Sequence, residues 1–220
     1  MTDVTLTFDN GPEPEVTPGV LDVLRTRGLH ATFFVLGRKL AEPGRRALAE
    51  RARDEGHWIG NHSWNHDRPL GELPDQDSVA EDEIGRTQAI IGDLSHPDRL
   101  FRPFGGGGAL GPHLLSAAAL AHLQRQRMTC ILWNAVPGDF RDPEGWVDRA
   151  LEMGRRPDPV TLVLHDLPNG AMRHLDRFLG LLADTGARFV QEFPDSCVPV
   201  RRGTVVGPVE GYVTSAGEAA

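Results

Sequence analysis

Acidic, amide and histidine side chains recur in this sequence directly after short apolar runs. An aspartate and a histidine in different surroundings can act as base and acid, and two histidines with an oxygen donor can bind a divalent ion. The candidate side chains are Asp9, Asn10, His62, His66, Arg102, Asp139, His165 and Asp166. They lie in the five segments Thr7–Pro12, Asn61–Pro69, Phe101–Gly108, Trp133–Phe140 and Leu162–Asp166. These residue types and positions point to acid–base and metal chemistry.

The segments that must position these side chains alternate between strand-like and helix-like runs. Strands are predicted at Val4–Phe8, Ala31–Leu36, His57–Asn61, Leu100–Arg102, Thr129–Trp133, Val160–Leu164 and Ala187–Val190. One helix is expected to have Thr17 as its N-cap and Pro18 at N1 and to end at Gly28, and a capping box of Ser78 and Glu81 predicts another start. Further helices are predicted at Pro112–Gln126, Gly145–Met153 and Met172–Asp184. This β-α alternation predicts a parallel sheet of the α/β class.

Polar segments follow the first, third, fourth, fifth and sixth predicted strands, so they meet only if the sheet closes or nearly closes. We therefore expect a distorted (β/α) barrel of about seven parallel strands over residues 3–192. Residues 193–220 are interpreted as a C-terminal tail with strand-like pieces at Val198–Val200 and Thr204–Val206. Its Gly-, Ala- and Ser-rich end is expected to fray.

Composition excludes several classes of protein and partner. The chain has 220 residues, 31 acidic against 23 basic, and a net charge of −8, which disfavours nucleic acid. Its two cysteines cannot make a disulfide scaffold. No run of apolar residues is long enough for a membrane span, and no export signal precedes the first predicted strand. We therefore expect a cytoplasmic protein that binds neither nucleic acid nor membrane.

Each polar segment has a simpler structural interpretation when it is taken alone. His62 and His66 would be surface or capping residues, and Asp139 would be a turn residue. His165 would be a hydrogen-bonded core histidine, and Arg102 would bridge to a surface carboxylate. All five segments follow strands in one consistent order, which favours the functional interpretation.

The motifs TFDNGP, HSWNH, RPF followed by glycine, GDF and LVLHD, in this order, resemble those of the polysaccharide deacetylases, the NodB-type carbohydrate esterases of family 4. The resemblance extends over Thr5–Val190. It implies a distorted (β/α) barrel and metal-dependent removal of acetyl groups from N-acetylated sugars. Relatives of this family hydrolyse other non-peptide carbon–nitrogen bonds, some of them without metal.

The resemblance implies an acid–base pair. Asp9 matches the general base and Arg102 the arginine that orients it, while His165 matches the general acid and Asp139 the carboxylate that orients this histidine. Amide hydrolysis needs an activated water and a proton for the leaving nitrogen. An arginine beside Asp9 and a carboxylate beside His165 push the two groups toward these opposite roles.

The resemblance also implies an oxyanion hole and a metal site. Phe104 would donate its backbone N–H to the oxyanion, and Gly105 would let the backbone approach a ligand closely. His62 and His66 match two metal-ligand histidines, and Asn10 stands where the family has the aspartate that is the third ligand.

Asn10 is the main departure from the family pattern. Its amide oxygen can bind a metal but lacks the charge that divalent ions favour. Three possibilities follow: Asn10 is a weak ligand for Zn²⁺, Co²⁺ or Mn²⁺, another carboxylate such as Asp67 or Glu13 substitutes, or the site works without metal. Two further departures are Phe140, where tryptophan is usual, and Val136, where another acid is usual.

The sequence thus predicts a hydrolase of non-peptide carbon–nitrogen bonds that deacetylates an N-acetylated sugar or a small amide. The lack of an export signal and the single tyrosine favour a small-molecule or oligosaccharide substrate over a polymer. The alternatives are a metal-independent, allantoinase-like ureide hydrolase and a catalytically silent carbohydrate- or amide-binding protein.

Overall fold

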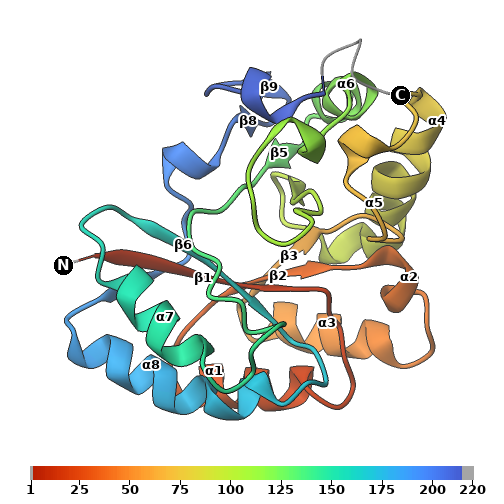
Figure 1. The fold of residues 1–220 in the computed structure, drawn as a ribbon. Helices are drawn as coiled ribbons and strands as arrows, with labels where there is room; N and C mark the ends of the chain where they lie inside the picture. The colour runs from red at the N-terminus through yellow and green to blue at the C-terminus, as the bar shows by residue number, and fades with distance from the viewer. Residues whose placement is uncertain (1, 215–220) are drawn as a thin grey trace.

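The computed structural model describes residues 2–214, in which parallel strands in the order β6-β1-β2-β3-β4-β5 curl into a distorted barrel (Figure 1). The strands are β1 (Asp3–Asp9), β2 (Thr32–Val35), β3 (Trp58–Asn61), β4 (Leu100–Phe101), β5 (Thr129–Cys130), β6 (Val160–His165) and β7 (Arg188–Val190). A parallel bridge between Ala135 and Leu162 connects the segment after β5 to β6 and so closes the ring of strand pairs. The predicted α/β barrel is confirmed.

β1 lies at the centre of the sheet and separates an apolar from a polar side. Val4, Leu6 and Phe8 are fully buried in the main hydrophobic cluster. Thr5, Thr7 and Asp9 alternate with them and therefore face the interior of the barrel. β1 pairs with β6 along its length and with β2 and β7 at its two ends. A polar interior built by alternation is what allows charged side chains to lie inside this barrel.

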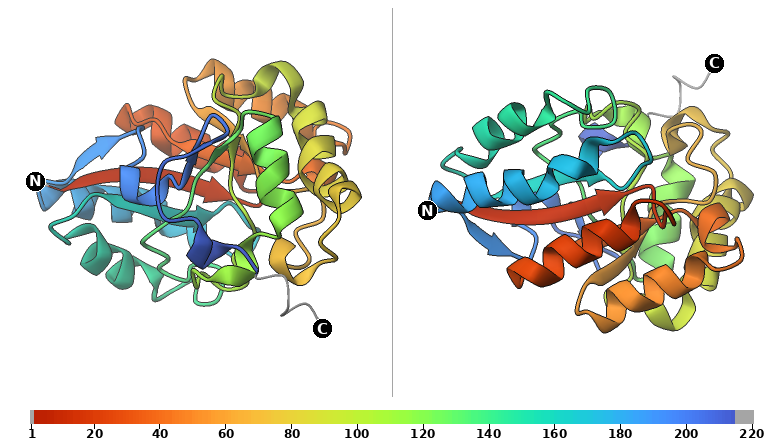
Figure 2. Two further views of the ribbon diagram at one scale, coloured as in Figure 1. Left: turned by 90° about the horizontal axis from the view of Figure 1, so that it is seen from above. Right: turned by 90° about the horizontal axis from the view of Figure 1, so that it is seen from below.

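Helices cover the apolar side of the sheet. They are α1 (Thr17–Arg27), α2 (Gly37–Leu40), α3 (Arg45–Asp54), α4 (Asp77–Ala80), α5 (Arg86–Ile91), α6 (Ala117–Arg125), α7 (Trp146–Gly154) and α8 (Leu175–Asp184). α7, α8, α1 and α3 follow one another around the barrel (Figure 2). Trp146 of α7 packs against Phe178 of α8, with ring centroids 5.0 Å apart. Within residues 2–214, no helix has the length and apolar character needed to cross a membrane.

The structure confirms the predicted helix end at Gly28 but not the predicted helix caps. Gly28 ends α1 in the left-handed conformation, with φ 63°. Thr17 is not the N-cap, because α1 already includes it and Val16 occupies the cap position. The predicted capping box is wrong, because α4 begins at Asp77 without a side-chain cap and Ser78 lies inside its first turn. Glu81 instead begins a π-helical turn, Glu81–Gly85, which joins α4 to α5. The predicted helix start is therefore confirmed to within one residue, but Ser78 does not cap the helix because it lies one residue inside it.

Two helices differ from the sequence prediction: one is shorter than predicted, and the other was not predicted. The predicted helix at Pro112–Gln126 divides into a 3-10 turn at Pro112–Leu114 and α6, because the hydroxyl of Ser116 caps α6 by accepting the N–H of Ala119. α3 was not predicted. It buries only Ala49 and Ala52, so its sequence carries little apolar periodicity.

The segment from residue 193 to 214 continues the sheet. β8 (Val200–Arg201) pairs antiparallel with β5, and β9 (Thr204–Val205) pairs with β8. The hydroxyl of Thr214 donates to the carbonyl oxygens of Gly71 and Pro112 at 2.9 Å. The strand-like piece predicted at Thr204–Val206 is confirmed as β9, whereas the piece predicted at Val198–Val200 shares only Val200 with β8. The Gly-, Ala- and Ser-rich end at 215–220 lies outside the described residues, and the domain boundary at 193 stays a prediction.

Candidate active site

Asp9 ends β1 and forms an ion pair with Arg102, which follows β4. Nη1 of Arg102 donates to Oδ1 of Asp9 at 2.9 Å and to the hydroxyl oxygen of Thr7 at 2.7 Å. Arg102 is fully buried, and its guanidinium carbon lies 4.1 Å from the ring centroid of Phe34. Breaking a buried pair of this kind leaves an uncompensated charge. Arg102 therefore fixes the orientation of the Asp9 carboxylate.

His165 ends β6, directly opposite Asp9 in the strand register. Its Nδ1 lies 2.9 Å from Oδ1 of Asp139, and its backbone N–H donates to Oδ2 at 2.7 Å. Because a carboxylate accepts, Nδ1 carries the hydrogen in this contact. Burial alone lowers the pKa of His165, but the hydrogen bond and charge of Asp139 outweigh it and raise that pKa above its ordinary value. His165 is therefore tuned toward the imidazolium, the form that donates a proton.

Replacing Asp139 by asparagine is expected to move the alkaline limb of the kcat/KM profile to lower pH. Asp139 raises the pKa of His165, so loss of its charge lets the acid form disappear earlier as the pH rises, by about one pH unit or more. The measurement is kcat/KM from pH 5 to 10, with Asp142→Asn as control because Asp142 pairs with Arg149 instead. An alkaline limb at the same pH in Asp139→Asn and wild type contradicts the role given to Asp139.

His62 and His66 follow β3, and their imidazole centroids lie 4.6 Å apart. Nδ1 of His62 lies 2.8 Å from the carbonyl oxygen of Arg102. A carbonyl only accepts, so Nδ1 is the donor and Nε2 keeps its lone pair. Burial lowers the pKa of His62 to about 3 and that of His66 to about 2. Both imidazoles are therefore neutral, which is the form that binds a metal.

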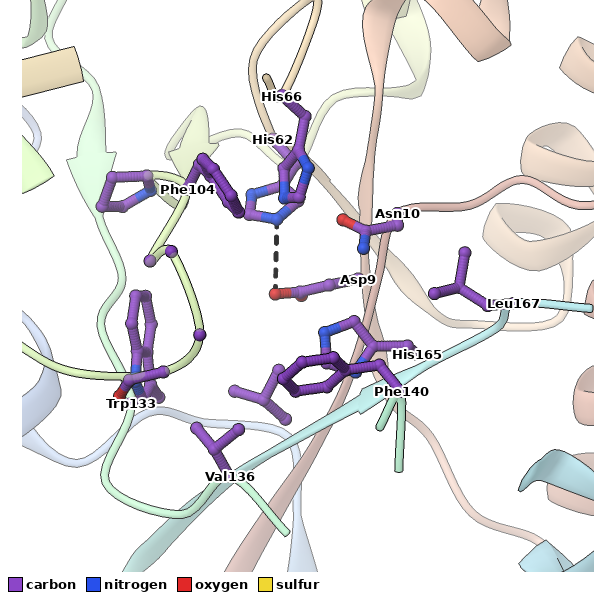
Figure 3. A pocket seen from close by; sticks show the side chains of 16 residues that line it. Asp9, Asn10, His62, His66, Phe104, Trp133, Val136, Phe140, His165 and Leu167 are labelled. Carbon is purple, nitrogen blue, oxygen red and sulfur yellow. Dashed lines mark hydrogen bonds and ion pairs between the residues drawn. The ribbon is translucent and has the colours of Figure 1, made fainter. Parts of the chain in front are cut away.

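Asn10 supplies an oxygen on the same side of the pocket. Its side-chain oxygen is buried without a hydrogen-bond partner among the described residues, and Figure 3 shows that oxygen turned toward the two imidazoles. Nε2 of His62 also lies 3.5 Å from Oδ2 of Asp9. Because the lone pair of this nitrogen faces a negatively charged oxygen, a cation between or beside them would be stabilised. Two neutral imidazoles and an unpartnered amide oxygen fit a divalent ion such as Zn²⁺. Over residues 2–214, no three His, Cys, Asp or Glu side chains are grouped so that they could hold a metal ion; beside the two histidines, the amide oxygen of Asn10 would be the third donor.

The two carboxylates considered as substitutes for Asn10 lie elsewhere. Glu13 pairs with Lys39 at 2.9 Å and with Arg45 at 3.0 Å. Asp67 is exposed. Neither residue lines the pocket that contains Asp9 and His165, so the structure does not bring either one to the two histidines.

The acid–base pair opens into a pocket with a largely apolar wall (Figure 3). Its lining consists of Asp9, Asn10, His62, His66, Pro103–Gly108, Trp133, Val136, Phe140, Val163, His165 and Leu167. The Phe104 ring packs on His66, with centroids 4.1 Å apart. A Cβ on Gly105 would lie 2.5 Å from the indole of Trp133, so glycine is required there. Both residues predicted to serve the oxyanion thus lie at the pocket.

Four further residues shape or support this site. Val136 and Phe140, noted above as departures from the family pattern, line the pocket, and the Phe140 ring lies edge-on to His165 at 4.9 Å. Thr7 holds Arg102, and its place two residues before Asp9 on β1 was a usable signal. The side-chain amide of Asn169 donates to the carbonyl oxygen of Asp139 at 3.0 Å, and no sequence pattern marked it.

Asp166 lies beneath the turn that follows Asp9. Its Oδ2 accepts the hydroxyl of Thr17, and a Cβ on Gly11 would lie 2.3 Å from the same oxygen. Asp166 is fully buried, and this burial raises the pKa of its carboxyl to about 7. Asp166 therefore supports the turn from within the fold, in contrast to His165 beside it, which faces the pocket.

Replacing Asp166 by asparagine is expected to weaken the fall in stability between pH 4 and 7. A carboxyl whose folded pKa is raised from 3.8 to about 7 stabilises the fold below pH 3.8, and this contribution is lost as the pH rises through 7. The free energy of unfolding of Asp166→Asn relative to wild type should therefore rise across this range by about 1 kcal/mol or more. Urea denaturation at each pH measures it, with Asp67→Asn as an exposed control. A constant difference contradicts the expectation.

Comparisons with known proteins agree with this geometry. The profile of the family described as polysaccharide deacetylase matches residues 2–124. A peptidoglycan-N-acetylglucosamine deacetylase of Bacillus cereus is 31% identical over 192 residues, which cover 85% of this chain and 84% of that protein. The peptidoglycan-N-acetylglucosamine deacetylase PgdA of Listeria monocytogenes is 30% identical over 190 residues, or 85% of this chain. The matched region spans only 37% of the length of PgdA.

A solved structure shows the same arrangement of the chain. The family 4 carbohydrate esterase from Streptomyces lividans, in complex with acetate, superposes with a TM-score of 0.71 at 26% identity. The match covers 94% of this chain and 98% of the esterase. Profile, relatives and structure together confirm the resemblance drawn from the five motifs: the chain belongs to the polysaccharide deacetylase family.

Proposed function

We propose that this protein is a hydrolase that removes acetyl groups from N-acetylated amino sugars. The observation that carries the proposal is the placement of Asp9 and His165 opposite each other on β1 and β6, each with its own partner of opposite charge. Arg102 supports the base and Asp139 supports the acid. A binding protein has no need of a base, an acid and a tuning partner for each, so this set of four residues supports catalysis.

The reaction consumes one water and yields acetate and a free amine. Asp9 takes a proton from the water as its oxygen forms a bond to the carbonyl carbon. The backbone N–H of Phe104 donates to the developing oxyanion, and one such donor typically lowers the barrier by about 3 to 4 kcal/mol. The imidazolium of His165 gives its proton to the amide nitrogen as the carbon–nitrogen bond breaks, so the amine leaves uncharged.

His62, His66 and Asn10 would hold a divalent ion, with Zn²⁺, Co²⁺ and Mn²⁺ as the candidates. A bound ion of this kind would lower the pKa of water to about 7 and polarise the carbonyl. The neutral amide of Asn10 gives such an ion less electrostatic stabilisation than a carboxylate would. We therefore propose a weak metal site.

We propose the N-acetylglucosamine unit of an oligosaccharide or glycan as the recognised group. The relatives from Bacillus cereus and Listeria monocytogenes bear names that specify this sugar. The apolar pocket wall, which includes Trp133, Phe140 and Leu167, suits the methyl group of an acetamide.

The test is product analysis with purified protein, with and without added Zn²⁺, Co²⁺ or Mn²⁺. The panel contains N-acetylglucosamine oligosaccharides, small N-acetyl amides and a cyclic ureide. Acetate released from the sugars supports the proposal. Ring opening of the ureide without metal, in place of acetate release, would assign a ureide hydrolase, and binding of a sugar without any product would assign a silent binding protein.

A further inference from the structure

The loop that carries His62 and His66 has a strained backbone. Ser63 has φ 66° and His66 has φ 56°, in the left-handed region that residues with a Cβ rarely adopt. Such conformations persist only where the surrounding structure imposes them, and they concentrate at functional sites. Something outside the loop must therefore hold it in this shape.

The buried carboxylate of Glu83 contacts the middle of this loop. Oε2 of Glu83 accepts the backbone N–H of Trp64 at 3.1 Å and that of Asn65 at 3.0 Å. Oε1 of Glu83 accepts the side-chain amide of Asn65. Glu83 is 8% exposed. Hydrogen bonds to a charged acceptor are stronger than neutral ones, and low exposure strengthens them further.

Other residues contact the rest of the loop: the N–H of Ser63 donates to Oδ1 of Asn61 at 3.0 Å, and the guanidinium carbon of Arg86 lies 3.6 Å from the ring centroid of Trp64. The N–H groups of Gly37 and Arg38 on α2 donate to the carbonyl oxygens of Ser63 and Trp64 at 3.0 and 3.3 Å. These bonds fix the carbonyl side of the loop. Among the described residues, the N–H groups of Trp64 and Asn65 have Glu83 as their acceptor, so loss of its carboxylate removes the protein acceptor of both backbone donors.

Glu83 reaches the loop from the π-helical turn Glu81–Gly85 between α4 and α5. Single π turns inside helices recur at functional sites, because the widened turn redirects side chains. The backbone carbonyl of Glu83 also accepts the hydroxyl of Thr87 at 2.9 Å, which ties the turn to α5. The carboxylate is thus presented by an element that is itself held in place.

We infer that Glu83 is a positioning residue that holds the loop between His62 and His66 so that both imidazoles face Asn10. This inference rests on the metal site of the proposed function. It assigns the carboxylate a task that the five motifs do not contain, namely pre-organising two ligands that it does not touch. Loss of the carboxylate should therefore loosen the loop and weaken metal binding while the barrel stays folded.

Three variants separate this role from a general effect on stability. Glu83→Ala removes all three acceptor contacts. Glu83→Gln is the conservative variant, because its amide oxygen can accept both backbone N–H groups and its NH₂ can donate to Asn65 after that amide flips. Glu81→Ala is the matched control from the same π turn, since the Glu81 side chain is 65% exposed and lies 3.7 Å from His122.

The first measurement is amide hydrogen exchange of the metal-free protein. Exchange at Trp64 and Asn65 should be about tenfold faster or more in Glu83→Ala, close to wild type in Glu83→Gln and unchanged in Glu81→Ala. Equal exchange in Glu83→Ala and wild type would overturn the inference. Faster exchange throughout β1 and β6 would also overturn it, because Glu83 would then support the whole fold.

The second measurement is the dissociation constant for Zn²⁺ by calorimetry. It should rise about 10- to 100-fold in Glu83→Ala, as for other residues that orient metal ligands, and stay unchanged in Glu81→Ala. An unchanged constant in Glu83→Ala would overturn the inference. If wild type bound none of Zn²⁺, Co²⁺ or Mn²⁺, the metal site of the proposed function would fail, and the exchange result alone would decide the role of Glu83.

Discussion

Replacing Asp9 by asparagine should lower kcat/KM for an N-acetylated sugar by about 10²- to 10⁴-fold, the usual contribution of a positioned base. The amide of asparagine has nearly the shape of the carboxylate. Its oxygen can still accept the hydrogen bond from Nη1 of Arg102, which lies 2.9 Å from Oδ1 in the wild type. It cannot take a proton from water at neutral pH. The change therefore removes the base and leaves the contacts around it.

The measurement is acetate release, with thermal unfolding to show that the variant is folded. Asp67→Asn is the control, because it removes an exposed carboxylate that does not line the pocket. His165→Ala should have an effect of similar size, since the leaving nitrogen then lacks its acid. Activity near that of wild type in a folded Asp9→Asn protein would exclude Asp9 as the base.

Replacing Asn10 by aspartate should tighten the binding of Zn²⁺ by about tenfold or more, because a full negative charge replaces a neutral dipole at short range. The side-chain oxygen of Asn10 is buried, has no hydrogen-bond partner within residues 2–214 and lies on the same side as the two imidazoles. A carboxylate oxygen in that position completes the ligand set that the family motif contains. Metal-dependent acetate release should rise as well.

The direct readout is the Zn²⁺ dissociation constant by calorimetry, which does not depend on turnover. Asp67→Asn and Glu13→Gln serve as controls, because neither residue lines the pocket; both should leave the constant unchanged. Equal Zn²⁺ affinity in Asn10→Asp and wild type would show that residue 10 is not a ligand.

Parallel-sheet geometry made the main elements of the site predictable. Asp9 and His165 end neighbouring parallel strands, and such ends meet at one edge of a sheet. Polar segments after five strands required a closed sheet. Alternation along β1 even places Thr7 beside Arg102. The sequence could therefore reveal the strand ends and the buried faces of the strands, because hydrophobic periodicity marks both directly.

The remaining contacts depend on tertiary structure that leaves no local pattern. The sheet closes through the bridge between Ala135 and Leu162, and Ala135 lies outside the strands that the apolar runs predict. No motif marked Glu83 in the sequence, and its carboxylate reaches the histidine loop from the π turn Glu81–Gly85. Asn169 likewise supports Asp139 from a turn with no distinguishing signal. These residues hold the motif side chains in place, and only a folded structure reveals them.

The most direct test of the proposed hydrolysis is the stoichiometry of its two products from an N-acetylglucosamine oligosaccharide. Acetate and new free amine are measured in parallel for wild type and Asp9→Asn. We expect one amine for each acetate in the wild type, and loss of both products in Asp9→Asn. Neither product from the wild type, with or without added Zn²⁺, Co²⁺ or Mn²⁺, or equal yields from the two proteins, would contradict it.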